Sequence, residues 1–417
     1  MESKYSFVNS YTLIAQTPLI HFQWRMKDAT LRASEVKPKL DRFIIQSVEE
    51  KGDTVPEEWR TMKGATSLDY QMQIRRTASK DWIDIKKIKN YFASKADEED
   101  KRIVFFDCQL DIICHKEELA AYIHKNLRKF FILNVFGARQ SKGFGGFLLK
   151  GTTAGEVHSE IKHAYGTFLY VDTDETETML QKLNHMFVLY TIMKNGINRT
   201  SYNKDRGEYL FPERYIKGYA VREFLPEDTG SDKAFLKAKV VKEKLQGGPK
   251  NEPAEYENYT FIRAMLGLAN GYMFRKPDGS IAKIRFYSFD ENTKEINKIE
   301  KFRSPVSIRL YKNRIYIFVE DTYKQMLGKN FVFLDEETFE RYKRCKEPED
   351  KIKICEACPH LSTPKTFDPK KFLCGFAQYF EENKEKLQKF YQGNKADEFS
   401  GSAKLVLNVA EGAPADE

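Results

Sequence analysis

The sequence predicts an α+β protein of tandem ferredoxin-like (RRM-like) modules with insertions and a cysteine-bearing C-terminal segment. Three observations predict this fold class. β-Branched and aromatic runs of strand length alternate with long amphipathic segments. The first 150 residues order these elements as strand, helix, insertion, strand, helix, glycine-rich turn and strand, which suits one such module. A strand near 166, a helix near 175 and strands between 280 and 335 repeat the scheme.

In the first module, 1–150, residues 5–23 alternate apolar and polar side chains and predict a strand. Residues 29–46 have helical spacing, and Pro38 within them predicts a turn before a second helical stretch. Residues 47–101 form a polar insertion, for which we expect a helix near 81–95. Residues 102–113 predict a strand and residues 115–136 the clearest helix, with acids early and bases late as the helix dipole favours.

The second module is expected at 151–335, and a hairpin within it should turn at Lys312–Asn313. Its strand is predicted at 166–174 and its helix at 175–198. A cysteine-bearing segment and a C-terminal helix follow at 336–394. The tail, 395–417, is rich in small and acidic residues, and we expect it to be disordered.

Composition excludes several classes of protein. The chain has 417 residues, of which 41% are hydrophobic, enough for real cores and too many for a disordered chain. No apolar run reaches the roughly 18 residues of a membrane helix, and the first 22 residues do not resemble a secretion signal. Six cysteines are too few for a disulfide scaffold, so we expect a cytoplasmic protein with no membrane partner.

The net charge of +8 permits a nucleic-acid partner, and the basic residues are clustered. Residues 121–150 contain six cations and no carboxylate, namely Lys125, Arg128, Lys129, Arg139, Lys142 and Lys150. Such a patch is typical of a polyanion-binding surface. A solvated helix face is the alternative interpretation, and for a charge run alone it is the better one.

The segment GARQSKGFGG (137–146) gives that patch a possible binding loop. Glycine allows a close approach of backbone to ligand, and exposed N–H groups beside Arg139 and Lys142 suit a phosphate backbone. The segment is not a phosphate loop of the GxxxxGK[ST] kind, and the helix precedes the glycines, unlike in a dinucleotide fold. A plain tight turn is the alternative.

The sequence resembles the RAMP superfamily of CRISPR-associated proteins. RQSKGFGGF is similar to that family's glycine-rich loop, and TPLIHF followed by ATLRASEVKPKLDRF resembles its first strand and helix. MLGLANGYMF and KFRSPVSIRLYKNRIYIF resemble late segments of the two-module head subunit of Cmr-type (type III-B) effector complexes. The resemblance covers 11–46, 130–150 and 262–319, in that order.

The resemblance implies a non-catalytic, RNA-binding subunit of an antiviral ribonucleoprotein complex. Its partners would be guide or target RNA and other CRISPR effector subunits. RNA in such grooves is held through phosphates, with bases against aromatic side chains. The expected RNA-binding residues are Arg32, Lys37, Lys39, Arg139, Lys142, Gly143, Phe144, Gly145 and Gly146.

Two alternatives stay open. The first is a RAMP-type endoribonuclease, metal-independent or metal-assisted, in which His21 or Asp28 is catalytic because relatives use a histidine or aspartate in that neighbourhood. His21 also fits a strand histidine in the core, and Asp28 also fits a helix cap. The second is a RAMP-like protein of another defence or RNA-handling assembly.

Four of the six cysteines cluster and predict a structural zinc ion. Cys345, Cys355, Cys358 and Cys374 include one C-x2-C pair, the usual spacing of a zinc knuckle, and His360 could replace one of them. Their segment is poor in apolar residues, so a metal would supply order. Unpaired thiols are the alternative. Cys108 and Cys114 are expected in the core.

Overall fold

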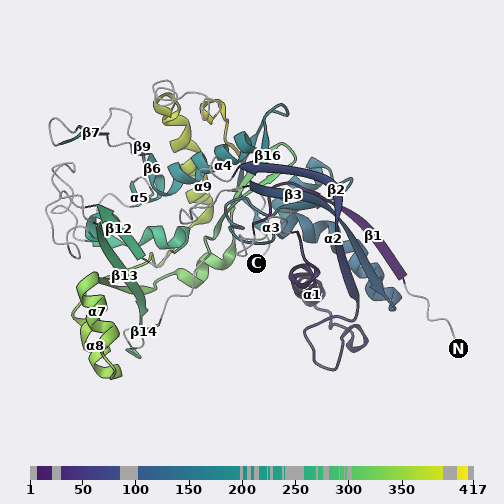
Figure 1. Cartoon of the computed structure of the whole chain (residues 1–417), viewed down its shortest axis with the longest axis horizontal. Coiled ribbons are helices and arrows are strands. Elements are labelled where there is room, and N and C mark those ends of the chain that lie inside the picture. The colour runs from purple at the N-terminus through teal and green to yellow at the C-terminus, as the bar shows by residue number, and fades with distance from the viewer. Residues whose placement is uncertain are drawn as a thin grey trace. The chain divides into compact units, whose positions relative to one another are not determined.

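We describe the chain from a computed structural model, shown in Figure 1. The structure describes residues 7–20, 30–84, 102–197, 201–203, 208–210, 216–222, 224–225, 229–236, 239, 258–268, 271–275, 281–290, 292–294, 296–297, 303–387 and 402–411. These residues fall into two compact units. Unit 1 takes those within 1–187, 307–318 and 408–417, and unit 2 takes those within 188–306 and 319–407.

Unit 1 begins with a four-stranded sheet of order β2-β3-β1-β4. Its elements follow one another as β1 (Phe7–Ala15), α1 (Ala33–Glu49), β2 (Gln71–Asp84), β3 (Arg102–Cys114), α2 (Glu117–Leu133) and β4 (Phe147–Leu149). Every pairing is antiparallel, with Tyr11 opposite Leu110 and Leu13 opposite Leu149. The three long strands run side by side in Figure 1, with α1 and α2 on one side of them.

The core of this sheet forms where the apolar stripes of α1 and α2 meet its inner face. Leu40 and Ile44 of α1 and Leu127 of α2 are fully buried in one cluster with Leu13 and Leu110. The expected turn at Pro38 is wrong, because α1 continues through that residue. Burial of the apolar residues on both sides of Pro38 stabilises the helix across the lost hydrogen bond.

The helix expected near 81–95 is wrong at residues 81–84, which belong to a strand. Residues 71–84 form β2, a strand that pairs with β3 from Gln71 opposite Ile113 to Asp84 opposite Arg102. Residues 85–100 lie outside the described ranges. The polar, Lys- and Arg-rich composition of β2 does not predict a strand. Its extended conformation is stabilised by pairing with the long strand β3.

A second sheet of unit 1 has the order β15-β16-β5-β19. Its strands are β5 (Phe168–Asp172), β15 (Val306–Tyr311), β16 (Arg314–Val319) and β19 (Asn408–Ala410). α3 (Ala154–Tyr165) packs Val157 and Ile161 against Phe168 and Phe318. Between β15 and β16 the chain turns at the predicted hairpin position, where Lys312 has a φ of 56°.

The disordered tail was expected to include residues 408–410, but these residues pair with β5, Val409 opposite Leu169. This short strand, Asn408–Ala410, completes a sheet edge that the local composition did not reveal. α4 (Met179–Lys194) follows β5.

Unit 2 contains the sheet β12-β13-β17-β18, on which β14 also pairs with β13. The bounds are β12 (Gly271–Arg275), β13 (Ile281–Phe289), β14 (Ile296–Asn297), β17 (Asn330–Asp335) and β18 (His360–Ser362). The helices α7 (Glu336–Arg344), α8 (Pro348–Glu356) and α9 (Pro369–Glu382) belong to the same unit. The cysteine-bearing segment therefore forms regular structure, with Cys355 in an apolar cluster beside Val332 and Leu334.

Short elements make up the rest of the described chain. They are η1 (Glu57–Trp59), β6 (Gly196–Ile197), β7 (Ser201–Asn203), β8 (Glu208–Leu210), β9 (Ile216–Lys217), α5 (Tyr219–Arg222), β10 (Thr229–Ser231), α6 (Asp232–Phe235), β11 (Asn258–Thr260), η4 (Ile262–Leu266), η5 (Asp321–Met326) and η7 (Ser402–Lys404). No helix within the described ranges has the length and apolar character needed to cross a membrane.

Candidate nucleic-acid interface

The glycine-rich loop, residues 137–146, lies between the end of β1 and the start of α1. The Gly137 N–H donates to the Glu35 carboxylate of α1, and the Gly145 N–H donates to the Pro18 carbonyl at 2.9 Å. On its other side the Ser141 carbonyl accepts a 3.1 Å bond from the Ile308 N–H. The loop therefore lies beside the beginning of the first helix, α1.

The glycines of this loop pack against the protein itself. Gly143 and Gly145 have φ values of 87° and 76°, which side chains rarely adopt. A Cβ at Gly145 would lie 1.8 Å from the Phe136 carbonyl oxygen, and one at Gly143 would lie 1.8 Å from Met186 Cε. The Gly146 N–H donates to Thr17 Oγ1 at 2.9 Å. The protein's own atoms therefore fill the side-chain directions of Gly143 and Gly145, and the part of these glycines in RNA binding stays a prediction.

Phe144, which is expected to bind RNA, lies inside the fold. Its side chain is 0% exposed, one of the largest fully buried side chains of the described residues. In this conformation the ring presents no face to a base. The glycines on both sides of it let the chain turn sharply enough to place the ring inside, which the sequence did not show.

Arg139 and Lys142 are the cations that the loop brings together. Both are partly exposed, Arg139 has a φ of 59°, and the Lys142 N–H donates to the Arg139 carbonyl at 2.9 Å. Burial, followed by the neighbouring charge of Arg139, lowers the pKa of the Lys142 ammonium to about 8. An anion bound beside the two cations would relieve this unfavourable environment.

The three basic residues of α1 differ from one another. Arg32 is exposed at the N-terminal end of α1. Lys37 instead donates to Asp41 Oδ2 and to the Leu68 carbonyl, both at 2.8 Å. Lys39 donates to the Val135 carbonyl at 2.7 Å, at the base of the glycine-rich loop. Lys37 and Lys39 therefore each bind a backbone carbonyl from a distant segment, and their contact with RNA stays a prediction.

The two candidate catalytic residues, His21 and Asp28, lie outside the described residues.

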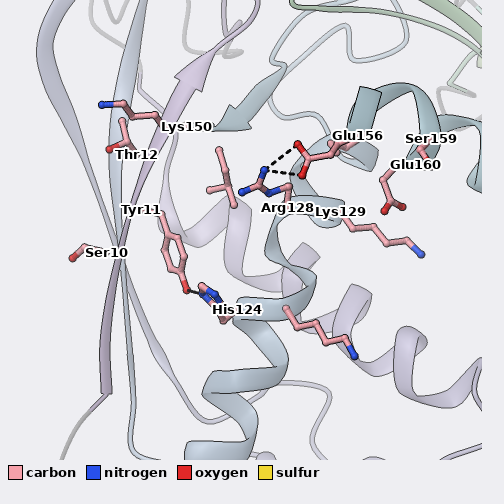
Figure 2. Close-up of a pocket in the computed structure, with 13 residues that line it drawn as sticks. Ser10, Tyr11, Thr12, His124, Arg128, Lys129, Lys150, Glu156, Ser159 and Glu160 are labelled. Carbon is pink, nitrogen blue, oxygen red and sulfur yellow. Dashed lines mark hydrogen bonds and ion pairs between the residues drawn. The ribbon is translucent and has the colours of Figure 1, made fainter. Parts of the chain in front are cut away.

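A pocket of about 580 Å³ lies between β1, α2 and α3, all in unit 1 (Figure 2). Its lining includes all four cations of the basic run that do not belong to the loop: Lys125, Arg128, Lys129 and Lys150. The Tyr11 hydroxyl meets His124 Nδ1 at 2.9 Å, and Figure 2 shows this pair on one wall. Burial raises the pKa of the Tyr11 hydroxyl, which keeps the phenol neutral.

Arg128 lies in the middle of this pocket and points toward Glu156 (Figure 2). Its Nη1 donates to both carboxylate oxygens, at 2.8 and 3.0 Å, and to the Gly151 carbonyl at 3.3 Å. Glu156 also closes the capping box of α3 by accepting from the N–H and hydroxyl of Thr153. These bonds from Thr153, followed by that from Arg128, lower the pKa of the Glu156 carboxyl.

Sequence reasoning did not find this pocket, although it found the cations. Positions 124, 125, 128 and 129 recur at intervals of three and four residues, and this spacing could have predicted one polar face of α2. The partners across the pocket, Tyr11 and Glu156, come from distant positions in the chain and left no local signal.

The four cysteines do not gather as a zinc ligand set. Cys345, Cys355 and Cys358 belong to one apolar cluster, and Cys374 lies on α9 outside that cluster. Burial, followed by the neighbouring Cys358, raises the pKa of the Cys355 thiol to about 12. In the part of the chain that the structure describes, no three His, Cys, Asp or Glu side chains converge as a metal site would require.

Two family models match most of the chain. The Cmr1 N-terminal domain matches residues 8–197, and the Cmr1 C-terminal domain matches residues 215–398. No curated protein matches. Among solved structures, a chain of the type III-B Cmr-beta bound to cognate target RNA, determined by cryo-EM, is similar at 16% identity and a TM-score of 0.25. That match covers 35% of this chain and 59% of the other.

Proposed function

The chain belongs to the Cmr1 family of CRISPR Cmr-complex subunits, and on that premise we propose that it binds RNA through its glycine-rich loop. The RNA would be guide or target RNA, and the other partners would be further subunits of the ribonucleoprotein complex. The proposal assigns no catalytic step to the chain.

One observation carries the proposal. The loop holds Arg139 and Lys142 together on a rigid base, in surroundings that lower the pKa of Lys142 to about 8. A protein gains nothing in stability from placing two like charges together, and a bound phosphate would offset their repulsion. Arg32, exposed at the start of α1, supplies a third cation on the element to which the loop is bonded.

The test is RNA binding by the full chain over a range of salt concentrations. Arg139→Ala/Lys142→Ala should weaken binding of a short single-stranded RNA of any sequence. The slope of log affinity against log salt should fall by about 1.4, because each phosphate contact to a single strand contributes roughly 0.7. The charge-matched control is Lys63→Ala/Arg341→Ala, which removes two exposed cations elsewhere.

Equal binding by the loop variant and the parent at every salt concentration would end the proposal. The same reactions also report on cleavage. Site-specific products that disappear in His21→Ala or Asp28→Ala would favour the endonuclease alternative.

The fold supports a finer proposal, that both sheets of unit 1 belong to ferredoxin-like modules. The first sheet has the spatial order β2-β3-β1-β4, so its neighbours across the sheet are the second, third, first and fourth strands in chain order. The strands β5, β15, β16 and β19 stand in that same order across the other sheet. The repeated order supports two modules, the second one interrupted after α4 and after β16. An experimental structure in which β19 pairs with another strand would contradict it.

A further inference from the structure

We propose that the pocket between β1, α2 and α3 binds one nucleotide of a single-stranded RNA, with a phosphate on Arg128. The inference rests on the proposed RNA-binding function and adds a second contact site, apart from the glycine-rich loop. The pocket and the loop draw on different halves of the same basic run, so their contributions can be separated by substitution.

Arg128 has hydrogen-bond donors available for a phosphate. Glu156 and Gly151 accept hydrogen bonds from Nη1 only, and within the described residues Nε and Nη2 make no hydrogen bond. The guanidinium is thus held in one orientation with donors left over, and its planar fork matches two phosphate oxygens. The Arg128 side chain is 41% exposed, so a ligand can reach it.

The charge of the pocket favours an anion. Lys125, Lys129 and Lys150 form no side-chain hydrogen bond or ion pair with any residue in the ranges described. The opposing carboxylates are those of Glu156, which is already paired with Arg128, and Glu160. Four cations against two carboxylates leave an excess of positive charge that one phosphodiester group and its neighbour would neutralise.

The edge of β1 adds neutral polar groups. The Thr12 carbonyl accepts a 2.8 Å bond from the Lys150 N–H, so the backbone of Thr12 faces the β4 side. Ser10 lies two residues earlier and therefore presents its N–H and carbonyl to the same edge. β4 pairs with β1 only at Leu13 through Ala15. The N–H and carbonyl of Ser10 therefore lie beyond the end of β4, and Ser10 is among the residues that line the pocket. An N–H and a carbonyl there suit the hydroxyls of a ribose.

Size and ring chemistry favour a single nucleotide over a duplex. A cavity of about 580 Å³ is in the range of small-ligand pockets and is too small for a helix of nucleic acid. The rings of Tyr11 and His124, whose centroids lie 5.8 Å apart and whose planes are tilted by 32°, give its wall an aromatic surface for a base. Single-stranded nucleic acid is held by this combination of cations and aromatic side chains.

The central test places a negative charge in the pocket without disturbing the ion pair. Ser159 is an exposed α3 residue that lines the pocket (Figure 2). Ser159→Asp should weaken binding of a short fluorescein-labelled single-stranded RNA at least about tenfold at low salt, because like charges repel. Ser159→Asn has the same size without the charge, and should bind as the parent does.

Arg128→Gln provides the second test, with a salt slope expected to fall by about 0.7. Competition identifies the ligand chemistry: AMP should displace the RNA from the parent more strongly than adenosine does, and this difference should shrink in Ser159→Asp. Should Ser159→Asp weaken AMP binding alone and leave RNA binding intact, the pocket would serve a free nucleotide and the RNA assignment would be wrong.

The failures of the two proposals are distinguishable. If Ser159→Asp and Ser159→Asn bind RNA equally while Arg139→Ala/Lys142→Ala loses binding, the loop function holds and the pocket inference is overturned. If the Ser159→Asp effect appears while the loop variant binds as the parent does, the pocket holds and the loop assignment falls. Loss of subunit assembly with unchanged RNA affinity would overturn the inference in favour of a protein-docking surface.

Discussion

The Gly145 N–H donates a 2.9 Å hydrogen bond to the Pro18 carbonyl oxygen, which ties the glycine-rich loop to the chain just after β1. The bond joins residues far apart in sequence, at a glycine whose φ is 76°. Through it the loop becomes part of the folded core of the module. Gly145, one of the glycines that suggested a ligand-binding loop, therefore has a structural role.

Gly145→Ala should strongly destabilise the protein. The added Cβ would meet the Phe136 carbonyl oxygen at 1.8 Å, and the left-handed backbone adds about 1–2 kcal/mol. Gly151→Ala is the matched control, because Gly151 has a φ of 86° with no atom within 4 Å of the added Cβ. Urea unfolding followed by circular dichroism should show a larger loss for Gly145→Ala. Equal losses would show that the close packing at Gly145 is absent.

Phe144→Ala should lower the free energy of unfolding by about 3–5 kcal/mol, as expected for truncation of a fully buried phenylalanine. Phe144→Leu keeps most of the apolar volume and should cost less. Both are measured by urea unfolding, with RNA affinity determined under conditions where the variants are folded. A variant of unchanged stability that binds RNA poorly would instead place the ring on the ligand.

RNA affinity should fall as the pH rises from 7 to 9. The folded pKa of Lys142, about 8, lies below its ordinary value, so the free protein loses this charge in a range where ordinary lysines keep theirs. Bound phosphate favours the charged form, so binding takes up a proton above about pH 8. Lys142→Arg keeps its charge throughout and should bind with little pH dependence over this range. The measurement is RNA titration at constant ionic strength, and equal pH dependence of both proteins would contradict the prediction.

The low pKa of Lys142 should make protein stability rise with pH, opposite to its effect on RNA affinity. Since the unfolded chain binds the proton more tightly, the depressed pKa makes unfolding free energy rise with pH between about 8 and 10.5. The stability from the neutral amine is fully present above that window and is lost as the pH falls through it. Urea unfolding of Lys142→Arg between about pH 8 and 10.5 should show no such rise in the free energy of unfolding.

The cysteine spacing predicts near one zinc ion per chain, lost in Cys355→Ser/Cys358→Ser, and this remains a prediction that metal analysis of the purified chain must test. Cys345, Cys355 and Cys358 share one apolar cluster, and Cys374 lies on α9 outside it. Cys374→Ser tests the fourth ligand separately. Metal-free protein whose stability survives the double substitution would contradict the zinc prediction.

Much of unit 1 follows from local patterns. β1, α1, β3, α2 and β4 lie close to the ranges predicted from apolar spacing, and the hairpin turns at Lys312–Asn313 as expected. The loop's place beside the start of α1 follows from the order of these elements. The family resemblance, confirmed by the two domain matches, likewise came from short motifs in the right sequence.

The sequence by itself therefore determined the order of elements, the family and the location of the basic residues, because periodicity and charge are local properties. Only the tertiary structure decided the partners. β2 and β19 are strands because distant strands pair with them, and Phe144 is buried because two glycines turn its ring inward. Lys37 is bonded to the Leu68 carbonyl, 31 residues away, while Arg128 is held by Glu156, 28 residues away. Such contacts depend on where the folded chain brings its segments together, so no local pattern predicts which cation stays available to a ligand.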